Sequence, residues 1–314
     1  MRMQVTHGSI APGGSRLALT IGNFDGVHCG HQAMLARTVS QARALRLASC
    51  VLTFEPHPRE FFTPAAAPAR LTRLRDKLEL MAAAGVNRVH VARFDAGLAA
   101  LAAEQFVEHI VARGLRAAWL LVGRDFRFGA RRRGDFALLE QLTARHGIEL
   151  EAMPEVALAG ERVSSSAVRA ALAAGKLASA ARLLGRHYSM SGRVAHGEKL
   201  GRDLGFPTAN VVLRGQVPLA GVFVVECMIE GETSWRQGVA SVGRRPTVNP
   251  VALPLLEVHV LDYNANIYRR HLQVRFLQKL RDEEKYDDVP ALRAAIARDA
   301  AQARTYFSKK KTHA

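Results

Sequence analysis

The sequence is poor in cysteine and in long apolar runs, and each shortage excludes a class of protein. Only three cysteines occur, Cys29, Cys50 and Cys227. Their wide spacing argues against the disulfide framework of a small secreted domain and indicates a reducing compartment. No apolar run approaches the roughly 20 residues of a membrane-spanning helix, and the first residues lack the basic and then apolar order of a signal peptide. We therefore expect a cytoplasmic protein that does not enter a membrane.

Acidic and aromatic residues are also scarce. The chain has 28 Asp and Glu against 44 Lys and Arg, a formal net charge of +16, and only 6% of its residues are aromatic. Such a charge suits polyanionic ligands, which include nucleic acids and nucleotide phosphates. The densest basic run, Arg131–Arg133, lacks the interleaved aromatic residues that stack on bases. We expect a solvated basic surface and no nucleic-acid partner. A basic nucleic-acid-binding protein on a nucleotide-binding fold is the alternative.

The first half of the chain alternates apolar runs with helical patterns. A chain of 314 residues, 48% of them hydrophobic, is long enough for two domains. Alternating strands and helices predict a doubly wound parallel α/β sheet. The expected strands are 17–21, 48–54, 86–94, 117–122 and 148–153, and the expected helices begin near residue 31 and span 73–84 and 101–113.

The pattern changes after residue 184. Helical periodicity disappears until about residue 289, and short alternating segments with turns replace it. This favours a compact antiparallel β-barrel closed by one helix, with the domain boundary between residues 184 and 185. The expected strands include 221–229, 255–262 and 271–277, and the expected helix spans 289–307.

The stretch from Leu17 to His31, LALTIGNFDGVHCGH, joins a predicted strand to a predicted helix. Ligands bind at the carboxyl ends of parallel strands, and a helix N-terminus there offers free N–H groups to phosphate. The glycines of the turn let a phosphate chain approach the backbone, and His28 and His31 can contact its oxygens from one side. The turn therefore predicts a phosphate site.

Two other interpretations of this turn are open. An ordinary connection between a strand and a helix needs no ligand. The spacing of His28 and His31, with Cys29 and Cys50 nearby, is also compatible with zinc, although no Cys-x-x-Cys pair follows. The complete order G-x-F-D-G-V-H-x-G-H is more specific than either alternative.

Three further polar segments of the first half follow predicted strands. Glu55–Pro58 contains two prolines that predict a loop without regular structure. Gly123–Gly129, GRDFRFG, follows the strand 117–122. Val163–Arg169, VSSSAVR, opens a helix whose hydroxyls can cap it, and these hydroxyls, the free N–H groups and Arg169 also suit the β- and γ-phosphates of ATP.

The densest motif of the second half is His196–Asn210, HGEKLGRDLGFPTAN. Glycines four residues apart predict a lid over phosphates, with a spacing that differs from a P-loop. Pro207 fixes an extended segment in which Thr208 and Asn210 project the same way. A hydroxyl and an amide oxygen are hard, neutral ligands that suit Mg²⁺ bound to nucleotide phosphates. A β-turn with capping residues is the structural alternative.

These motifs together resemble one family. The first-half motifs are similar to the H-x-G-H nucleotidyltransferases, and more closely to the adenylyltransferase half of the bacterial bifunctional riboflavin kinases/FAD synthetases. The order G-x-x-x-G-R-x-L-G-F-P-T-A-N, followed by G-V-F, G-R-R-P-T and L-E-V-H-V-L-D, resembles the riboflavin kinase half. The resemblance covers almost the whole chain. It departs at Phe223, where the family has Tyr, and at Ser241, where it usually has Asn.

The resemblance implies a fold and a two-step activity. We expect a Rossmann-like nucleotidyltransferase domain, residues 1–184, followed by a β-barrel kinase domain with a C-terminal helix, residues 185–314. The kinase would phosphorylate riboflavin to FMN with ATP and Mg²⁺, and the first domain would join FMN to AMP from ATP, giving FAD and pyrophosphate. The small molecules riboflavin, FMN and ATP would be the partners of a monomer or weak homo-oligomer. A single-function enzyme with one degenerate half is a rival hypothesis.

The resemblance also implies site residues. Glu257 would be the general base of the kinase, Thr208 and Asn210 would bind the metal, and His28, His31 and Arg169 would be catalytic in adenylyl transfer. Nucleotide-binding positions would be Gly22, Asn23, Phe24, Asp25, Gly26, His28, His31, Asp125, Ser164, Ser165, Ser166 and Arg169 in the first half, and Gly197, Lys199, Gly201, Gly205, Pro207 and Thr208 in the second. Flavin-binding positions would be Phe54, Pro56, His57, Pro58, Phe126, Phe128 and Arg281.

Overall fold

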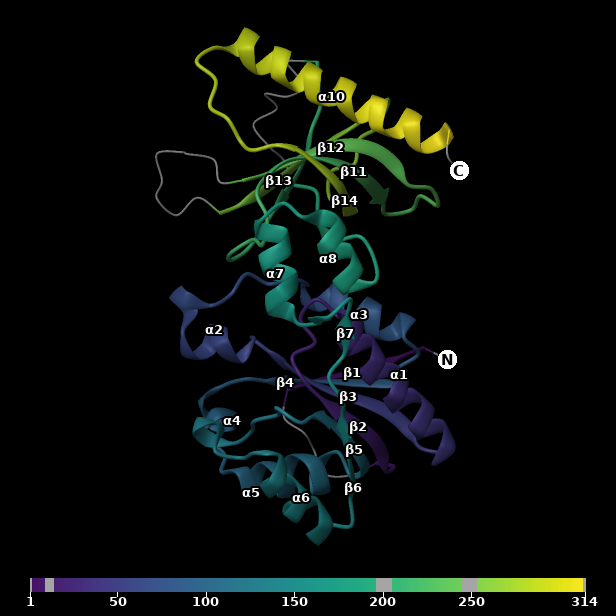
Figure 1. The fold of residues 1–314 in the computed structure, drawn as a ribbon, viewed down its shortest axis with the longest axis vertical. Helices are drawn as coiled ribbons and strands as arrows, with labels where there is room; N and C mark the ends of the chain where they lie inside the picture. The colour runs from purple at the N-terminus through teal and green to yellow at the C-terminus, as the bar shows by residue number, and fades with distance from the viewer. Residues whose placement is uncertain (1, 9–13, 196–204, 244–252, 313–314) are drawn as a thin grey trace. The chain divides into compact units, whose positions relative to one another are not determined.

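The structure, a computed structural model, describes residues 2–8, 14–195, 205–243 and 253–312 (Figure 1). The chain divides into two compact units. The first comprises residues 1–68 and 74–164, and the second comprises residues 69–73 and 165–314.

The first unit is built on a six-stranded sheet in which every pair of neighbours is parallel. The order β1-β4-β3-β2-β5-β6 reverses at β2, whose sequence neighbour β3 lies on one side and β5 on the other. Ligands of doubly wound sheets bind outside the carboxyl ends of the strands at such a reversal. The strands are β1 (Gln4–Gly8), β2 (Leu17–Ile21), β3 (Ala48–Glu55), β4 (Arg88–Arg93), β5 (Ala117–Gly123) and β6 (Glu149–Met153).

Helices cover both faces of this sheet (Figure 1). Leu35 of α1 (Cys29–Ala44) and Met81 of α3 (Leu74–Ala83) pack on one face, and Val107 of the π-helix η2 (Phe106–Gly114) and Leu139 of α6 (Phe136–Arg145) pack on the other. This two-sided burial explains why the central strands are almost wholly apolar. The remaining elements are α2 (Pro58–Phe62), η1 (Pro64–Ala66), α4 (Ala96–Ala100), α5 (Ala103–Gln105), η3 (Ala130–Arg132) and the hairpin of β7 (Ala157–Leu158) and β8 (Glu161–Arg162).

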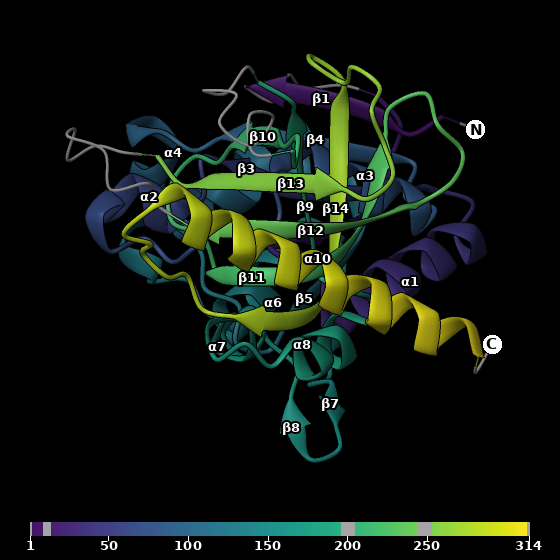
Figure 2. The same ribbon diagram turned by 90° about the horizontal axis from the view of Figure 1, so that it is seen from above.

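The second unit is a nearly closed antiparallel barrel with the order β10-β13-β12-β11-β14-β9. A bridge between Ala195 and Asn210 joins the two ends of the sheet. Ala303 and Phe307 of α10 are buried on the outer face of β11 and β12, which α10 crosses (Figure 2). The elements are α7 (Ser165–Ala173), α8 (Leu177–Leu184), β9 (Ser189–Arg193), β10 (Ala209–Val212), β11 (Gly221–Ile229), β12 (Arg236–Gly243), β13 (Leu255–Val260), β14 (His271–Arg281) and α10 (Val289–Thr312).

The structure confirms the predicted fold class, a parallel α/β sheet followed by an antiparallel barrel with a C-terminal helix. One local prediction was wrong. Glu55–Pro58 is not wholly irregular, because Pro58 opens α2, where its missing N–H and fixed φ are compatible with a first helical turn. The helix predicted over 101–113 is present as a short α-helix, Ala103–Gln105, that continues as the π-helix η2.

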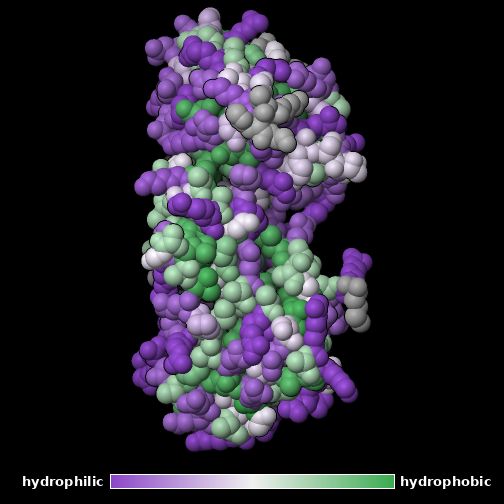
Figure 3. Space-filling view, turned by 45° about the vertical axis from the view of Figure 1, so that its right-hand side comes forward, coloured by the Kyte–Doolittle hydropathy of each residue, from purple (hydrophilic) through white to green (hydrophobic). Residues whose placement is uncertain are grey.

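One face of the molecule is shown in Figure 3. Hydrophilic side chains dominate the upper part of this view, and hydrophilic and apolar side chains are mixed over the lower part. None of the described helices is both long and apolar enough to cross a membrane.

Candidate active sites

The turn between β2 and α1, which carries the predicted phosphate-binding residues, has a strained backbone. Phe24, Gly26 and Val27 all have positive φ, at 49°, 87° and 41°, a conformation that costs free energy in residues other than glycine. Phe24 is completely buried and Val27 nearly so, so their packing in the core beside α1 and α3 holds the turn in this shape. Strain retained at a strand end of this kind is typical of a functional site.

The two predicted histidines lie together at the start of α1. His28 is the N-cap residue, and its Nδ1 accepts a hydrogen bond from the backbone N–H of His31 at 3.3 Å. Since Nδ1 is the acceptor, neutral His28 carries its proton on Nε2. The two rings stack with centroids 3.7 Å apart. Gly30 allows this arrangement, because a Cβ there would lie 3.2 Å from the His28 ring.

The charge state of His31 is set by its surroundings. Burial, assisted by the positive charges of His28 and Lys77, holds the pKa of His31 well below its ordinary value. His31 is therefore uncharged at neutral pH and can donate one hydrogen bond. Its buried Nδ1 has no hydrogen-bond partner among the described residues, and a buried polar atom of this kind is compatible with a role in binding or catalysis.

The segment after β5 reaches the same edge of the sheet. Asp125 is exposed and accepts a hydrogen bond from the Arg162 guanidinium at 2.8 Å. The rings of Phe126 and Phe128 stack with centroids 5.5 Å apart. Phe128 is buried in the core, where it also meets Phe106, so Phe126 is the more accessible ring of the predicted flavin pair.

The segment after β3 combines a helix cap with an aromatic cluster. His57 is the N-cap of α2 and accepts a hydrogen bond from the Arg59 N–H at 3.1 Å through Nδ1. Pro56 and Pro58 flank it. The ring of Phe54 meets the edge of Phe94, and Phe61 and Phe62, which the sequence analysis did not select, join this cluster from α2 while remaining exposed.

The hydroxyls predicted to bind phosphate open α7. Ser164 ends the first unit, and Ser165 and Ser166 begin the helix of the second. Arg169 lies one turn further along α7, and its Nε donates to the carbonyl oxygen of Ala69 at 2.6 Å. The predicted helix start is confirmed. The joint arrangement of these residues with His28 and His31 stays a prediction.

In the barrel, the predicted metal ligands and general base share one surface. Asn210 of β10 pairs with Glu257 of β13, and Glu257 pairs on its other side with Ser241 of β12. Directly opposed residues of antiparallel strands project to the same face. Asn210 is 6% exposed and its Oδ1 has no partner in the described part of the chain.

The segment that precedes β10 is anchored on β13. Nδ1 of His259 donates to the carbonyl oxygen of Pro207 at 3.0 Å, and its ring meets the edge of Phe206. This anchor fixes Thr208 two residues before Asn210, on the same side of the extended chain. Gly205 lies at the start of the described segment with φ of 84°, and the predicted Gly197, Lys199 and Gly201 lie outside the described residues.

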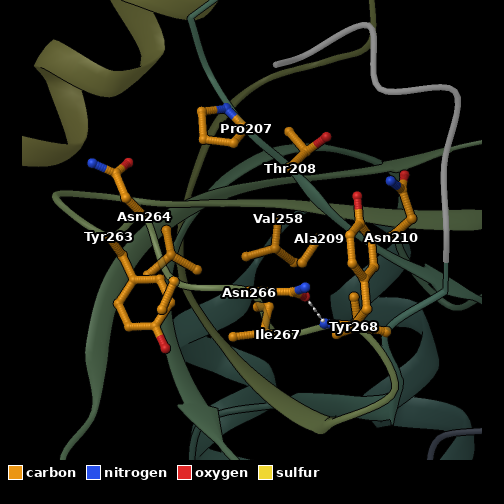
Figure 4. A pocket seen from close by; sticks show the side chains of 13 residues that line it. Pro207, Thr208, Ala209, Asn210, Val258, Tyr263, Asn264, Asn266, Ile267 and Tyr268 are labelled. Atoms are coloured by element: carbon orange, nitrogen blue, oxygen red, sulfur yellow. Dashed lines mark hydrogen bonds between the residues drawn. The ribbon is translucent and has the colours of Figure 1, made fainter.

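A cavity of about 480 Å³ opens beside these residues (Figure 4). The size is within the roughly 300–1,000 Å³ of small-molecule sites. No charged side chain is among the residues that line it. The lining residues are Val194, Pro207, Thr208, Ala209, Asn210, Val258, Val260, Tyr263, Asn264, Ala265, Asn266, Ile267 and Tyr268.

Arg281, predicted to bind flavin, is engaged with the C-terminal helix. Its guanidinium donates to both carboxylate oxygens of Asp299 at 2.7 and 3.1 Å, and Asp299 is buried. Two residues on, Glu283 lies against Gly243. Burial and the nearby charge of Glu257 raise the pKa of Glu283, so two carboxylates face the same corner of the barrel.

The zinc alternative gains no support. No group of three His, Cys, Asp or Glu side chains in the described residues is arranged to hold a metal. Cys50 is part of the sheet core, and burial raises the pKa of its thiol to about 12, so it is a packing residue at neutral pH.

Two groups at these sites are not among the residues predicted from the sequence. Lys77 belongs to the apolar stripe of α3 and is 4% exposed; a lysine within the Leu74, Leu78 and Met81 spacing was the available signal. Tyr263 and Tyr268, from the connection between β13 and β14, line the cavity, and no local pattern in the sequence marked them.

Comparisons with known proteins identify a family for each half of the chain. The FAD synthetase family model matches residues 13–167 and the riboflavin kinase family model matches residues 184–307. The bifunctional riboflavin kinase/FMN adenylyltransferase of Escherichia coli K12 is 48% identical over 290 residues, 92% of each chain. That of Pseudomonas fluorescens is 48% identical over 305 residues, 96% of this chain and 97% of its own.

A solved structure resembles the fold of this chain. A Streptococcus pneumoniae protein described as a macrolide-efflux protein superimposes with a TM-score of 0.80 and 26% identity, covering 96% of this chain and 99% of that one. The family resemblance seen in the motifs is thus confirmed. The chain belongs to the family of bifunctional riboflavin kinase/FMN adenylyltransferases, with an FAD synthetase domain followed by a riboflavin kinase domain.

Proposed function

We propose that this chain converts riboflavin to FMN in the barrel and FMN to FAD in the parallel-sheet unit, using ATP in both steps. The observation that carries the kinase half is the pairing of Asn210 with Glu257 beside a cavity without charged side chains. The adenylyltransferase half is supported by the stacked His28–His31 pair at the switch point of the sheet.

In the kinase step, Glu257 acts as the general base. It accepts the proton of the riboflavin 5′-hydroxyl as that oxygen attacks the γ-phosphorus of ATP, and the bond from that phosphorus to the β-phosphate oxygen breaks to release ADP. Ser241 and Asn210 flank Glu257 on the neighbouring strands, which fixes the position of its backbone relative to both.

The side-chain oxygens of Thr208, just before β10, and of Asn210 in β10 fit Mg²⁺. The Asn210 Oδ1 is a buried oxygen with no partner in the described residues, and the Thr208 hydroxyl lies two residues away on the same side. Mg²⁺ keeps several waters and needs only one or two protein oxygens beside the substrate phosphates. When bound, the ion would neutralise charge that develops on the transferring phosphoryl group.

The cavity takes the nucleoside part of ATP. Amide side chains of Asn264 and Asn266 can hydrogen-bond base and sugar, and the rings of Tyr263 and Tyr268 lie on either side of Asn266 (Figure 4). Asn266 is held in place because its Oδ1 accepts the Tyr268 N–H at 3.0 Å. The test is Asn266→Ala, which should raise KM for ATP and leave KM for riboflavin unchanged; the reverse result would assign the cavity to flavin.

In the adenylyl step, the FMN phosphate is itself the nucleophile. One of its oxygens attacks the α-phosphorus of ATP, the bond to the bridging oxygen of the β-phosphate breaks, and pyrophosphate leaves. No covalent protein intermediate is needed, so the protein contributes positioning and charge stabilisation. His28 and uncharged His31 donate hydrogen bonds to phosphate oxygens, and Arg169 stabilises the leaving pyrophosphate.

We also propose that the functional boundary lies between residues 184 and 185 and that the enzyme works in the cytoplasm as a monomer or weak homo-oligomer. Its substrates would be small molecules, with no nucleic-acid partner. The basic surface then serves anionic nucleotides by long-range attraction.

A chromatographic time course tests both activities at once. Purified protein is incubated with riboflavin, ATP and MgCl₂, with an EDTA control. FMN should appear first and FAD after it, and EDTA should stop both. FMN without FAD would remove the adenylyltransferase half of the proposal, and conversion of supplied FMN to FAD with no conversion of riboflavin would remove the kinase half.

A further inference from the structure

Tyr263, in the wall of the barrel cavity, is held by the hairpin that joins β11 to β12. Its side chain lines the cavity, and its hydroxyl donates a hydrogen bond to Oε1 of Glu232 at 2.9 Å. The second carboxylate oxygen, Oε2, accepts a hydrogen bond from Nε of Arg236 at 2.7 Å. The guanidinium carbon of Arg236 lies 5.4 Å from the centre of the Tyr263 ring. Glu232 therefore joins the hairpin to the cavity wall.

The hairpin gives Glu232 a fixed position. Gly231, with φ of 88°, allows the chain to turn sharply after β11. The N–H of Glu232 closes this turn by donating to the carbonyl oxygen of Ile229 at 2.9 Å. Since β11 pairs with β12 on one side and with β14 on the other, Glu232 stands on the best-supported part of the sheet.

Burial separates this contact from a neighbouring ion pair. Asp262 accepts two hydrogen bonds from Arg304 of α10, but the side chains of this pair are 74% and 52% exposed. Ion pairs with that exposure contribute little. The side chain of Glu232 is only 16% exposed, and hydrogen bonds to a carboxylate are stronger than those between neutral groups. We therefore expect the contact with Glu232 to fix the orientation of the Tyr263 ring.

The protonation states suit this hydrogen bond. The hydrogen bond from Arg236 lowers the pKa of Glu232, so the carboxylate is ionised at neutral pH and accepts. Burial, followed by the hydrogen bond to Glu232, raises the pKa of Tyr263, so the phenol keeps its proton and donates. The hydroxyl proton is thus directed to Glu232, and the ring remains for contact with a ligand in the cavity.

We propose that Glu232 is a positioning residue for nucleotide recognition in the kinase step: it holds the Tyr263 hydroxyl and so fixes the Tyr263 ring as a stacking surface for the base of ATP. This rests on the proposed function, in which the cavity takes the nucleoside part of ATP. A ring that is already fixed loses less conformational freedom when a base stacks on it, so the nucleotide binds more tightly. Glu232 is not among the residues that line the cavity, so it acts through Tyr263.

The test compares Glu232→Ala, Tyr263→Phe, Tyr263→Ala and the double variant Glu232→Ala/Tyr263→Ala in the full-length protein. Tyr263→Phe removes the hydroxyl and keeps the ring. Glu226→Ala is the matched control, because Glu226 lies on β11, pairs with Lys310 and has a side chain that is 22% exposed. The measurements are kcat, KM for ATP and KM for riboflavin in FMN formation, and KM for ATP in FAD formation from supplied FMN.

Glu232→Ala and Tyr263→Phe should each raise KM for ATP in FMN formation by about fivefold or more, while kcat and KM for riboflavin stay within about twofold of the wild type. KM for ATP in FAD formation should not change, because that step is assigned to the other unit. Glu232→Ala should add nothing to Tyr263→Ala, since the carboxylate then has no ring to position. Glu226→Ala should match the wild type in every measurement.

Three results would contradict the proposal in different ways. An unchanged KM for ATP in Glu232→Ala, or the same increase with and without the Tyr263 ring, would show that Glu232 does not position Tyr263. An unchanged KM for ATP in both Tyr263→Ala and Asn266→Ala would refute the assignment of the cavity to ATP, and this inference with it. Absence of FMN formation by the wild type would refute the proposed kinase function itself.

A second measurement does not depend on the folding of Glu232→Ala. In wild-type protein with tyrosine labelled with ¹³C at Cζ, the Tyr263 resonance is identified by its absence from Tyr263→Phe. Added ADP should shift this resonance, because the base stacks on the ring. A Tyr263 resonance that stays in place at saturating ADP would overturn the proposal.

Discussion

Asn210 and Glu257 lie directly opposite each other on β10 and β13, so their side chains leave the sheet on the same face with Cβ atoms about 5 Å apart. The ladder register therefore holds the proposed metal ligand, Asn210, and the proposed general base, Glu257, next to each other on a rigid part of the barrel. Each of these two proposed roles gives one prediction.

Glu257→Gln should remove the carboxylate that is proposed to accept the proton, and it keeps the size and shape of the side chain. We expect FMN formation to fall by about 10²–10⁴-fold, the usual contribution of a positioned general base, while conversion of supplied FMN to FAD is unchanged. Glu226→Gln is the control, because Glu226 pairs with Lys310 and is not a strand partner of Asn210, Ser241 or Glu257. Unchanged FMN formation in Glu257→Gln would remove Glu257 from the mechanism.

Asn210→Ala should change the metal requirement of the kinase. The variant lacks the Asn210 Oδ1, which has no hydrogen-bond partner among the described residues and is the proposed metal ligand. The Mg²⁺ concentration for half-maximal FMN formation should therefore rise by roughly tenfold. Titration of MgCl₂ at saturating ATP measures this shift. Thr208→Ser keeps its hydroxyl and should resemble the wild type; an unshifted titration in Asn210→Ala would argue that Asn210 does not bind the metal.

His31 should make the first unit less stable in acid. Its pKa in the folded protein is lowered by burial and then by His28 and Lys77, so the unfolded chain binds a proton that the folded chain does not. The unfolding free energy contributed by His31 is therefore complete above pH 6.5 and declines as the pH falls below it, by up to about 1.4 kcal/mol per pH unit.

Urea unfolding followed by Trp119 fluorescence measures this effect. Trp119 is fully buried in β5, and a Trp235→Phe background leaves it as the single reporter, since the chain has two tryptophans. His31→Gln should flatten the loss of stability between pH 6.5 and pH 5. Burial lowers the pKa of His90 as well, so His90 accounts for part of the slope that remains. Equal slopes in His31→Gln and the parent would contradict the prediction.

Gly129→Ala should destabilise the first unit strongly. Gly129 has φ of 69° and ψ of 175°, a region nearly restricted to glycine, and a Cβ there would lie 2.7 Å from backbone atoms of Ala103. We expect a loss of about 3 kcal/mol or more in unfolding free energy. Gly147→Ala, with φ of 63° and open space around its Cβ, should cost only about 1–2 kcal/mol. Similar losses in both variants would show that the contact with Ala103 contributes nothing.

The alternation of elements and the chemistry-bearing turns could be predicted from the sequence because both are local. Apolar periodicity over a few residues separates the strand 17–21 from the helix that follows it, and Gly22, His28 and His31 are recognised by order alone. The same holds for Pro207, Thr208 and Asn210, whose shared direction is a consequence of an extended chain. The order of the motifs along the chain identified the family before any tertiary contact was known.

Only the tertiary structure decided which of these residues meet. Asn210 and Glu257 are distant in sequence, and their opposition depends on the register of β10 against β13, which is fixed by the burial of one face of each strand. Lys77 is an ordinary helical lysine in the sequence. It becomes a buried charge beside His31 because the strained turn at Phe24 packs against α3. Register and burial are cooperative properties of the folded chain, and no local pattern encodes them.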